Sequence, residues 1–232
     1  MKTWMWIWKL LERVMRTNER IEPTRLCRVG FFIMQNTKGL LHTICSQLIG
    51  TRFKVDQFAM QRSVADSIEG MVTQYVIDNI ESFDYTAKKA KSKRSIEDVL
   101  VAKDGMKFFV DVKSKHIGAA FSMPNLISIG RLTKLYADAN KYLLYVFVYY
   151  QHKETTVDIR QVEAVPIEFM DWKDLCIANL GTGQLQIKNA NNPIGKYEGD
   201  RQSWIDNLNK NYMIFCEQLI QKITKRISCI KT

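Results

Sequence analysis

The sequence contains few residues of the kinds that build disulfide frameworks and zinc sites. Its five cysteines are odd in number, widely spaced and form no Cys-x-x-Cys pair, so we expect neither kind of structure. The three histidines, His42, His116 and His152, show no metal-ligand spacing and are expected to be surface or hydrogen-bonded core residues. This cysteine usage is typical of a protein from a reducing compartment.

Repeats, low-complexity tracts and Pro/Gly-rich linkers are also missing, which indicates one structural unit. The apolar run near the N-terminus, residues 4–11, is interrupted by Lys9 and lacks a small-residue cleavage site. It therefore fits neither a signal peptide nor a membrane span. An amphipathic helix over about 3–16 fits better, either as a core or dimer-packing helix or as a membrane-surface anchor.

Acidic residues are scarce relative to basic ones. The 24 Asp and Glu face 34 Lys and Arg, so the formal net charge is +10 and the pI is near 9.3. A polyanion is the natural partner of such a chain, and DNA, RNA and an anionic membrane all remain possible. Hydrophobic residues make up 46% of the 232 positions, which is ordinary for a globular protein and excludes disorder as the main description.

The hydrophobic patterns predict a mixture of helices and strands. Helices are expected over about 37–49, 56–80, 124–138 and 203–227, with a short one after Asp171 that ends before Gly181. Strands are expected over 141–150, as a long buried central strand, and over 157–165. The pair Gly181 and Gly183 is too short for a nucleotide-phosphate fingerprint and is interpreted as a turn.

A β-hairpin is predicted around Asp104 and Gly105, because a two-residue type I′ turn needs positive φ at both positions. With this turn, Asp98 lies opposite Asp111 across the two strands, with Cβ atoms about 4.5–5.5 Å apart. Lys113 follows two residues after Asp111 and shares its face of the strand. The hairpin is therefore expected to gather two carboxylates and an ammonium.

Two like charges directly opposite one another destabilise a hairpin, and a divalent cation would reverse the sign of that effect. Mg²⁺ accepts one or two carboxylates and completes its shell with water and phosphate oxygens. The neighbouring Lys113 could stabilise charge on a phosphate or position a water. The group suggests metal-dependent phosphodiester hydrolysis, although an Asp-x-Lys tripeptide also arises by chance and two aspartates can face each other at a solvated edge.

A basic run directly precedes the hairpin and consists of Lys88, Lys89, Lys91, Lys93 and Arg94. Such a run is often a solvated loop, but this one leads into Asp98, where a phosphate backbone would have to arrive. A second candidate DNA-binding segment holds Gln184, Gln186, Lys188 and Asn189. Its amides could pair with adenine and its lysine could reach guanine or phosphate, or the segment could be an edge strand with a polar outward face.

Asp98, twelve intervening residues and then Asp111-Val112-Lys113 match the PD-(D/E)xK nuclease pattern. The run from Ile96 through Lys113 to residues 123–128 resembles type II restriction endonucleases of the EcoRV-like branch, which includes HincII and SwaI. Segments 142–150, 184–187 and 199–204 are similar to the same branch. The resemblance covers residues 60–225 in patches and leaves the first 55 residues unmatched.

The resemblance implies a restriction-endonuclease-like α/β core, a mixed central sheet of about five strands flanked by helices. It implies one domain over 1–232, with a helical extension over 1–55 for dimerisation or packing and a catalytic and DNA-recognition core over 56–232. Asp98 and Asp111 would bind Mg²⁺, Lys113 would be the catalytic lysine, and Glu69 matches an accessory acidic position. Ser114 and Lys115, next to that lysine, and Asn125 are further DNA-contact candidates.

One departure lies in the loop after the lysine. Members of this branch can insert a glutamine from that loop into the DNA stack, and here Ser122 occupies the corresponding position, between Phe121 and Met123. Either neighbour could act as an apolar wedge between bases, or could simply pack.

The residues and the resemblance together predict a Mg²⁺-dependent type II restriction endonuclease. The resemblance implies that it acts as a homodimer on a palindromic site in double-stranded DNA and leaves blunt ends. We expect a cytoplasmic prokaryotic protein with no membrane partner and with a cognate DNA methyltransferase in the same system. A structure-selective nuclease, such as a junction resolvase or repair enzyme, and a non-catalytic DNA-binding or membrane-associated protein remain alternatives.

Overall fold

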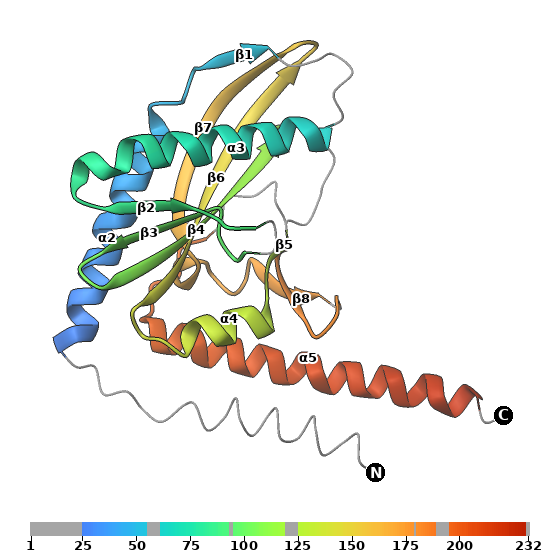
Figure 1. The fold of residues 1–232 in the computed structure, drawn as a ribbon. Coiled ribbons are helices and arrows are strands. Elements are labelled where there is room, and N and C mark those ends of the chain that lie inside the picture. The colour runs from blue at the N-terminus through green and yellow to red at the C-terminus, as the bar shows by residue number, and fades with distance from the viewer. Residues whose placement is uncertain are drawn as a thin grey trace.

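The computed structural model describes residues 25–54, 61–92, 95–118, 125–178, 180–188 and 195–230. The elements in chain order are α2 (Arg25–Ser46), β1 (Arg52–Lys54), α3 (Gln61–Ile80), η1 (Glu81–Phe83), β2 (Thr86–Lys89), β3 (Val99–Lys103), β4 (Met106–His116), β5 (Asn125–Ser128), α4 (Ile129–Tyr136), β6 (Lys141–Lys153), β7 (Thr156–Pro166), η2 (Ile167–Phe169), β8 (Leu175–Ala178), β9 (Gln184–Ile187) and α5 (Arg201–Ile230) (Figure 1). The helix expected over 3–16 lies outside the described residues.

The main sheet has six strands in the order β1-β7-β6-β4-β3-β2. The pair β4 and β6 is parallel, and the other pairs are antiparallel. A separate antiparallel sheet has the order β5-β9-β8. The expected α/β class with a mixed central sheet is confirmed, with six strands in that sheet rather than about five and with a second small sheet that was not foreseen.

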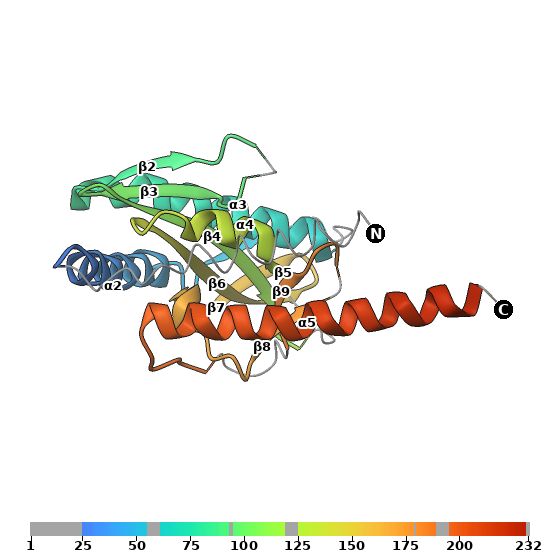
Figure 2. The same ribbon diagram turned by 90° about the horizontal axis from the view of Figure 1, so that it is seen from below.

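Each face of the main sheet has its own apolar core, because successive side chains of a strand point to opposite sides. Val146 and Val148 of β6 join the core formed with α2 and α3, whereas Tyr145 and Phe147 join the core formed with α4, the small sheet and the start of α5. Figure 2 shows α3 and α5 on opposite sides of the strands. The predicted central strand is therefore apolar throughout because both of its faces are buried.

The predicted hairpin is present with the predicted register. Asp104 and Gly105 have φ values of 49° and 77°, and Lys103 pairs with Met106. Positive φ at both turn residues is what a type I′ turn requires. Turn chemistry alone was therefore enough to align β3 with β4.

Two predicted helices are corrected by the structure. The helix expected over 124–138 is a strand over Asn125–Ser128 followed by α4. The short helix expected after Asp171 is instead a turn followed by β8, which pairs with β9. The strand β5 pairs with β9, which is distant in sequence, whereas β8 pairs with β9 as the next strand along the chain. In both places the backbone hydrogen bonds between strands override the local helical pattern.

The remaining helices differ from expectation mainly at their ends. α2 runs over Arg25–Ser46 rather than 37–49 and places Met34, Leu41 and Ile44 in the core beside α3. α3 runs over Gln61–Ile80 and ends where the sequence predicted. Residues 55–60, before its start, lie outside the described residues. Within the described part of the chain, no helix is both long enough and apolar enough to cross a membrane.

Candidate active site

Asp98 lies immediately before β3 and is held against β4 by two hydrogen bonds. Its backbone N–H donates to the Val110 carbonyl at 2.8 Å, and its Oδ2 accepts the backbone N–H of Val112 at 2.8 Å. Regular pairing of the two strands ends one residue later along the chain, with Val99 opposite Val110. The carboxylate of Asp98 therefore takes the place of a strand carbonyl, and it still lies close enough to Asp111 to act on it through its charge and a hydrogen bond.

Asp111 and Lys113 form a close ion pair on β4. Lys113 Nζ lies 2.9 Å from Oδ1 and 2.8 Å from Oδ2 of Asp111. The Asp111 residue is only 7% exposed, whereas 28% of the Lys113 side chain remains exposed. The ammonium is thus the counter-ion of a nearly buried carboxylate and keeps an opening to solvent.

The electrostatics of this group are dominated by burial. Burial raises the pKa of Asp111 to about 7, against the lowering effect of the Lys113 charge and hydrogen bond, and Asp98 raises it further through its charge and a hydrogen bond. Burial lowers the pKa of Lys113, but attraction by Asp111, Glu69 and Asp98 outweighs this and leaves it above its ordinary value. The lysine is therefore held as an ammonium beside two carboxyls that repel each other.

Glu69 approaches β4 from α3. Its Oε1 accepts two hydrogen bonds from Ser114, one from the backbone N–H and one from the hydroxyl, both at 3.0 Å. Burial raises the pKa of Glu69, while the Ser114 backbone hydrogen bond and the Lys113 charge lower it. Ser114, expected to contact DNA, is in this structure the anchor for Glu69, whereas Lys115 beside it is half-buried, and burial lowers its pKa.

The oxygen atoms of Asp98 and Asp111 fit a hard divalent cation. Within the described ranges, no group of three or more His, Cys, Asp and Glu side chains is placed to hold a metal ion. Mg²⁺ nevertheless binds proteins through only one or two carboxylates and fills its other positions with water and phosphate oxygens. A cation between the two carboxylates would also relieve the repulsion that contributes to the raised pKa of Asp111.

The basic run borders the candidate site. Lys88 and Lys89 are exposed on β2, the edge strand that pairs with β3, and Lys91 is exposed just beyond it. The Ala90 N–H donates to the Asp98 carbonyl at 2.8 Å, which ties this segment to the first carboxylate. Two further members of the run, Lys93 and Arg94, lie outside the described residues.

The expected base-reading residues are only partly open to a ligand. Gln186 is 7% exposed, and its side-chain Nε2 donates to the side-chain Oδ1 of Asn125 across β5 and β9. Gln184 is half-buried, and Lys188 is exposed and donates to the Lys173 carbonyl at 2.8 Å. The other candidates, Phe121, Ser122, Met123 and Asn189, lie outside the described residues.

The sequence reasoning missed that these amides belong to a second sheet. β9 is the central strand of β5-β9-β8, so the alternative of an edge strand is wrong, and Gln186 pairs with Asn125 rather than pointing into solvent. The alternation of polar and apolar residues in 184–187 signalled a strand, but nothing in the sequence identified its two partners.

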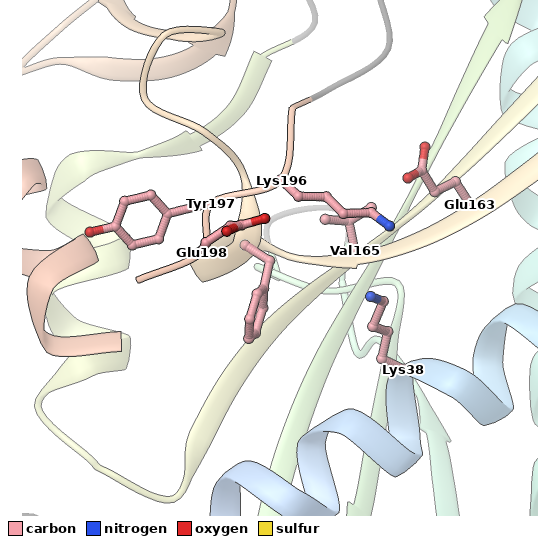
Figure 3. A pocket seen from close by; sticks show the side chains of 7 residues that line it. Lys38, Glu163, Val165, Lys196, Tyr197 and Glu198 are labelled. Atoms are coloured by element: carbon pink, nitrogen blue, oxygen red, sulfur yellow. The ribbon is translucent and has the colours of Figure 1, made fainter. Parts of the chain in front are cut away.

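A small cavity elsewhere in the molecule does not coincide with the carboxylates. It measures about 160 Å³ and is lined by Lys38, Glu163, Val165, Phe169, Lys196, Tyr197 and Glu198. Figure 3 shows it between α2, which carries Lys38, and the segment around Lys196. None of Asp98, Asp111 and Lys113 lines it.

Comparison with known proteins adds a likeness of fold. No family model and no curated protein matches the chain. Among solved structures, the NlaIV restriction endonuclease is similar, with a TM-score of 0.46 and 10% identity over 71% of this chain and 74% of that chain. At this level the likeness carries no argument about activity, and it does not support the narrower branch that includes HincII and SwaI.

Proposed function

We propose that this chain is a Mg²⁺-dependent nuclease that hydrolyses phosphodiester bonds in double-stranded DNA. The observation that carries the proposal is the ion pair of Asp111 and Lys113 at 2.8 Å beside the anchored carboxylate of Asp98. A structural role alone gives no reason to crowd two carboxylates so that burial and mutual repulsion raise the pKa of Asp111 to about 7. A shift of this size is typical of functional sites.

Each residue of the group has a distinct role in this proposal. The Val112 N–H keeps one oxygen of Asp98 occupied and so directs the other toward the ligand. Asp111 supplies the second carboxylate, and Lys113 stabilises negative charge that develops on the phosphate. When bound between the carboxylates, Mg²⁺ would supply Lewis acidity toward phosphate oxygens and the attacking water.

The finer assignment is a type II restriction endonuclease that works as a homodimer on a palindrome and leaves blunt ends. It is supported by the residues that resemble that family, from Ile96 through Lys113 and again in 184–187 and 199–204. Gln184, Lys188 and Asn189 are the residues proposed for base contacts, and the basic run before Asp98 is proposed for phosphate contacts. A cognate DNA methyltransferase would protect the host genome.

Removal of either carboxylate tests the proposal. We expect Asp98→Ala and Asp111→Ala to reduce Mg²⁺-dependent cleavage of plasmid DNA by roughly 10²-fold or more, as loss of a preorganised electrostatic group does. Binding to a DNA duplex without metal should persist. Asp66→Ala is the matched control, because Asp66 is exposed on α3 and should leave cleavage unchanged.

Full cleavage activity in either carboxylate variant would contradict the assignment. Sequencing of the fragment ends from a long DNA of known sequence separates the finer alternatives. Discrete fragments with flush ends support a restriction endonuclease, whereas cleavage only at branched or damaged DNA supports a structure-selective nuclease. Binding of duplex DNA with no nicking at any Mg²⁺ concentration would instead indicate a non-catalytic DNA-binding protein.

A further inference from the structure

The face of the main sheet that carries Asp111 and Lys113 continues well beyond them. Residues in register across neighbouring strands point to the same face, so rows of side chains follow one another along β4, β6, β7 and β1. The rows are Lys113–Phe147–Glu163, Lys115–Tyr149–Gln161, Gln151–Asp158–Arg52 and Lys153–Thr156–Lys54. Two residues along a strand span about 6.7 Å, so these rows extend the candidate site by about 20 Å.

The apolar cover of this face ends where the polar rows begin. Phe147 belongs to the core beneath the small sheet, and half-buried Tyr149 packs at its margin. Beyond Tyr149 the side chain of Arg52 is 70% exposed, and Lys54 and Lys153 are exposed. Figure 1 shows the β6–β7 hairpin and β1 extending past α3, away from α4 and α5.

A β-bulge turns one further cation onto this face. Tyr149 pairs with Gln161 but Tyr150 pairs with Ile159, so Arg160 is an extra residue in β7. Ile159 and Val162 are both buried in the core on the opposite face. Counted back from Val162, regular alternation would place Arg160 in that same core. The bulge instead places Arg160 beside Gln161 on the polar face, which is the usual effect of such an insertion.

Side-chain contacts confirm the direction of Arg160. Its Nε donates to Gln151 Oε1 at 3.1 Å, and its Nη2 lies 2.9 Å from Asp158 Oδ2. The same Asp158 oxygen lies 3.3 Å from Arg52 Nε. Asp158 is only 7% exposed, so it orients two guanidinium groups from beneath while both remain open to solvent.

The polar face is strongly basic. We define the basic strip as five cationic residues: Arg52, Lys54, Lys115, Lys153 and Arg160. Its acidic neighbours among the described residues are Asp158 between the arginines, Glu163 in the row of Lys113 and Glu154 in the hairpin turn. A cationic surface with few apolar side chains suits a phosphate backbone better than a membrane, which also takes up apolar groups.

We propose that the basic strip binds the sugar-phosphate backbone of the DNA duplex and leads it to the carboxylates. The strip is continuous with the candidate active site through Lys115 and Lys113, which lie two residues apart on the same face of β4, so one strand bound along it passes Asp111. This inference rests on the proposed function. It adds a DNA-contact surface on β1, β6 and β7, remote in sequence from the basic run before Asp98.

Two double variants test the strip, with a 30-base-pair duplex of random sequence as the probe. Lys54→Ala/Lys153→Ala removes two exposed ammonium groups, and Arg52→Gln/Arg160→Gln removes the two guanidinium groups above Asp158. Binding is measured by fluorescence anisotropy at several salt concentrations without divalent metal. The control is Lys222→Ala/Lys225→Ala, which removes two exposed cations from the far part of α5.

Each strip variant is expected to weaken duplex binding roughly tenfold and to lower the slope of log affinity against log salt by about 2, because each lost phosphate contact releases about one counterion fewer. The α5 control should match wild type. If wild-type protein binds the duplex and Lys54→Ala/Lys153→Ala binds it with the same affinity and the same salt slope, the proposal for the strip is wrong. Binding of anionic vesicles in preference to the duplex would overturn it as well.

Cleavage assays on the same proteins separate this inference from the proposed function. If the strip variants lose affinity but wild-type protein never cuts plasmid DNA with Mg²⁺, the strip stands as a DNA-binding surface and the nuclease assignment fails. If wild-type protein cuts and the strip variants bind and cut equally well, the nuclease assignment stands and the strip fails.

Discussion

Asp111 illustrates how a single residue can be unfavourable for folding and useful for chemistry. It is almost fully buried, and burial raises its pKa to about 7 even though Lys113 contacts both of its oxygens. An apolar or amide side chain would avoid this penalty. A buried carboxyl group beside a second carboxylate is typical of sites where a bound cation or substrate offsets the cost of burying the charge.

This raised pKa predicts how stability depends on pH. An Asp in the unfolded chain titrates near 3.9, below the value of about 7 for folded Asp111. The stabilising contribution of the protonated form is complete below pH about 4 and is lost as pH rises through about 7. The free energy of unfolding from this group should fall by up to roughly 1.4 kcal/mol per pH unit in that window.

Urea unfolding at pH 5, 6, 7 and 8 without divalent metal measures this fall. Asp111→Asn cannot titrate, so its stability should lack the part of the decline that belongs to Asp111. Millimolar Mg²⁺ should stabilise wild type more at pH 8 than at pH 5, because the ionised carboxylate is the ligand. Parallel pH profiles for wild type and Asp111→Asn would show that the carboxyl does not titrate in this range.

Among the secondary-structure elements, β4 is the one on which the candidate site depends. It contributes Asp111 and Lys113 to one face, and at Ser114 its backbone and side chain are bound by Glu69 from α3. Val112 at the same time binds Asp98 at the start of β3. The end of β4 is therefore fixed from both sides at the point where the lysine emerges.

We expect Glu69 to act by positioning this end of β4. Glu69→Gln keeps an oxygen acceptor for both Ser114 bonds, whereas Glu69→Ala removes it. Because a hydrogen bond to a charged group contributes about 1.5–3 kcal/mol, the alanine variant should lower the melting temperature and reduce kcat roughly tenfold or more. The glutamine variant should retain most of both, and Glu81→Ala, in exposed η1, should match wild type.

A different result would assign Glu69 a different role. If Glu69→Gln is as inactive as Glu69→Ala while its melting temperature stays at the wild-type value, the charge of the carboxylate is required rather than its hydrogen bonds. Glu69 would then act on the metal or substrate directly.

Each chain carries a single copy of the group formed by Asp98, Asp111 and Lys113. Cutting both strands of a palindrome calls for two such groups related by the two-fold symmetry of the DNA, which a homodimer supplies. Sedimentation equilibrium of the full chain with the duplex should therefore give a complex whose mass is twice 27.0 kDa plus the mass of the duplex. A complex of one chain and one duplex, together with single-strand nicks as the only product, would contradict the homodimer.

Local patterns in the sequence were sufficient for the parts of the fold that short-range physics controls. The Asp104-Gly105 turn determined the register of β3 and β4, because a two-residue loop with positive φ leaves only one alignment. The apolar run of β6 identified the buried central strand, because a strand covered on both faces is apolar at successive positions. These two elements were enough to predict that Asp111 and Lys113 share a face.

The tertiary structure alone decided everything that depends on a distant partner. The pairing of β5 with β9 replaced the start of a predicted helix with a strand and joined Gln186 to Asn125. The reach of Glu69 to Ser114, and the bulge that turns Arg160 toward Asp158, have no local signature. Hydrogen bonds and burial between residues far apart in the chain outweigh local propensity, and a short window of sequence does not contain the partners that make them.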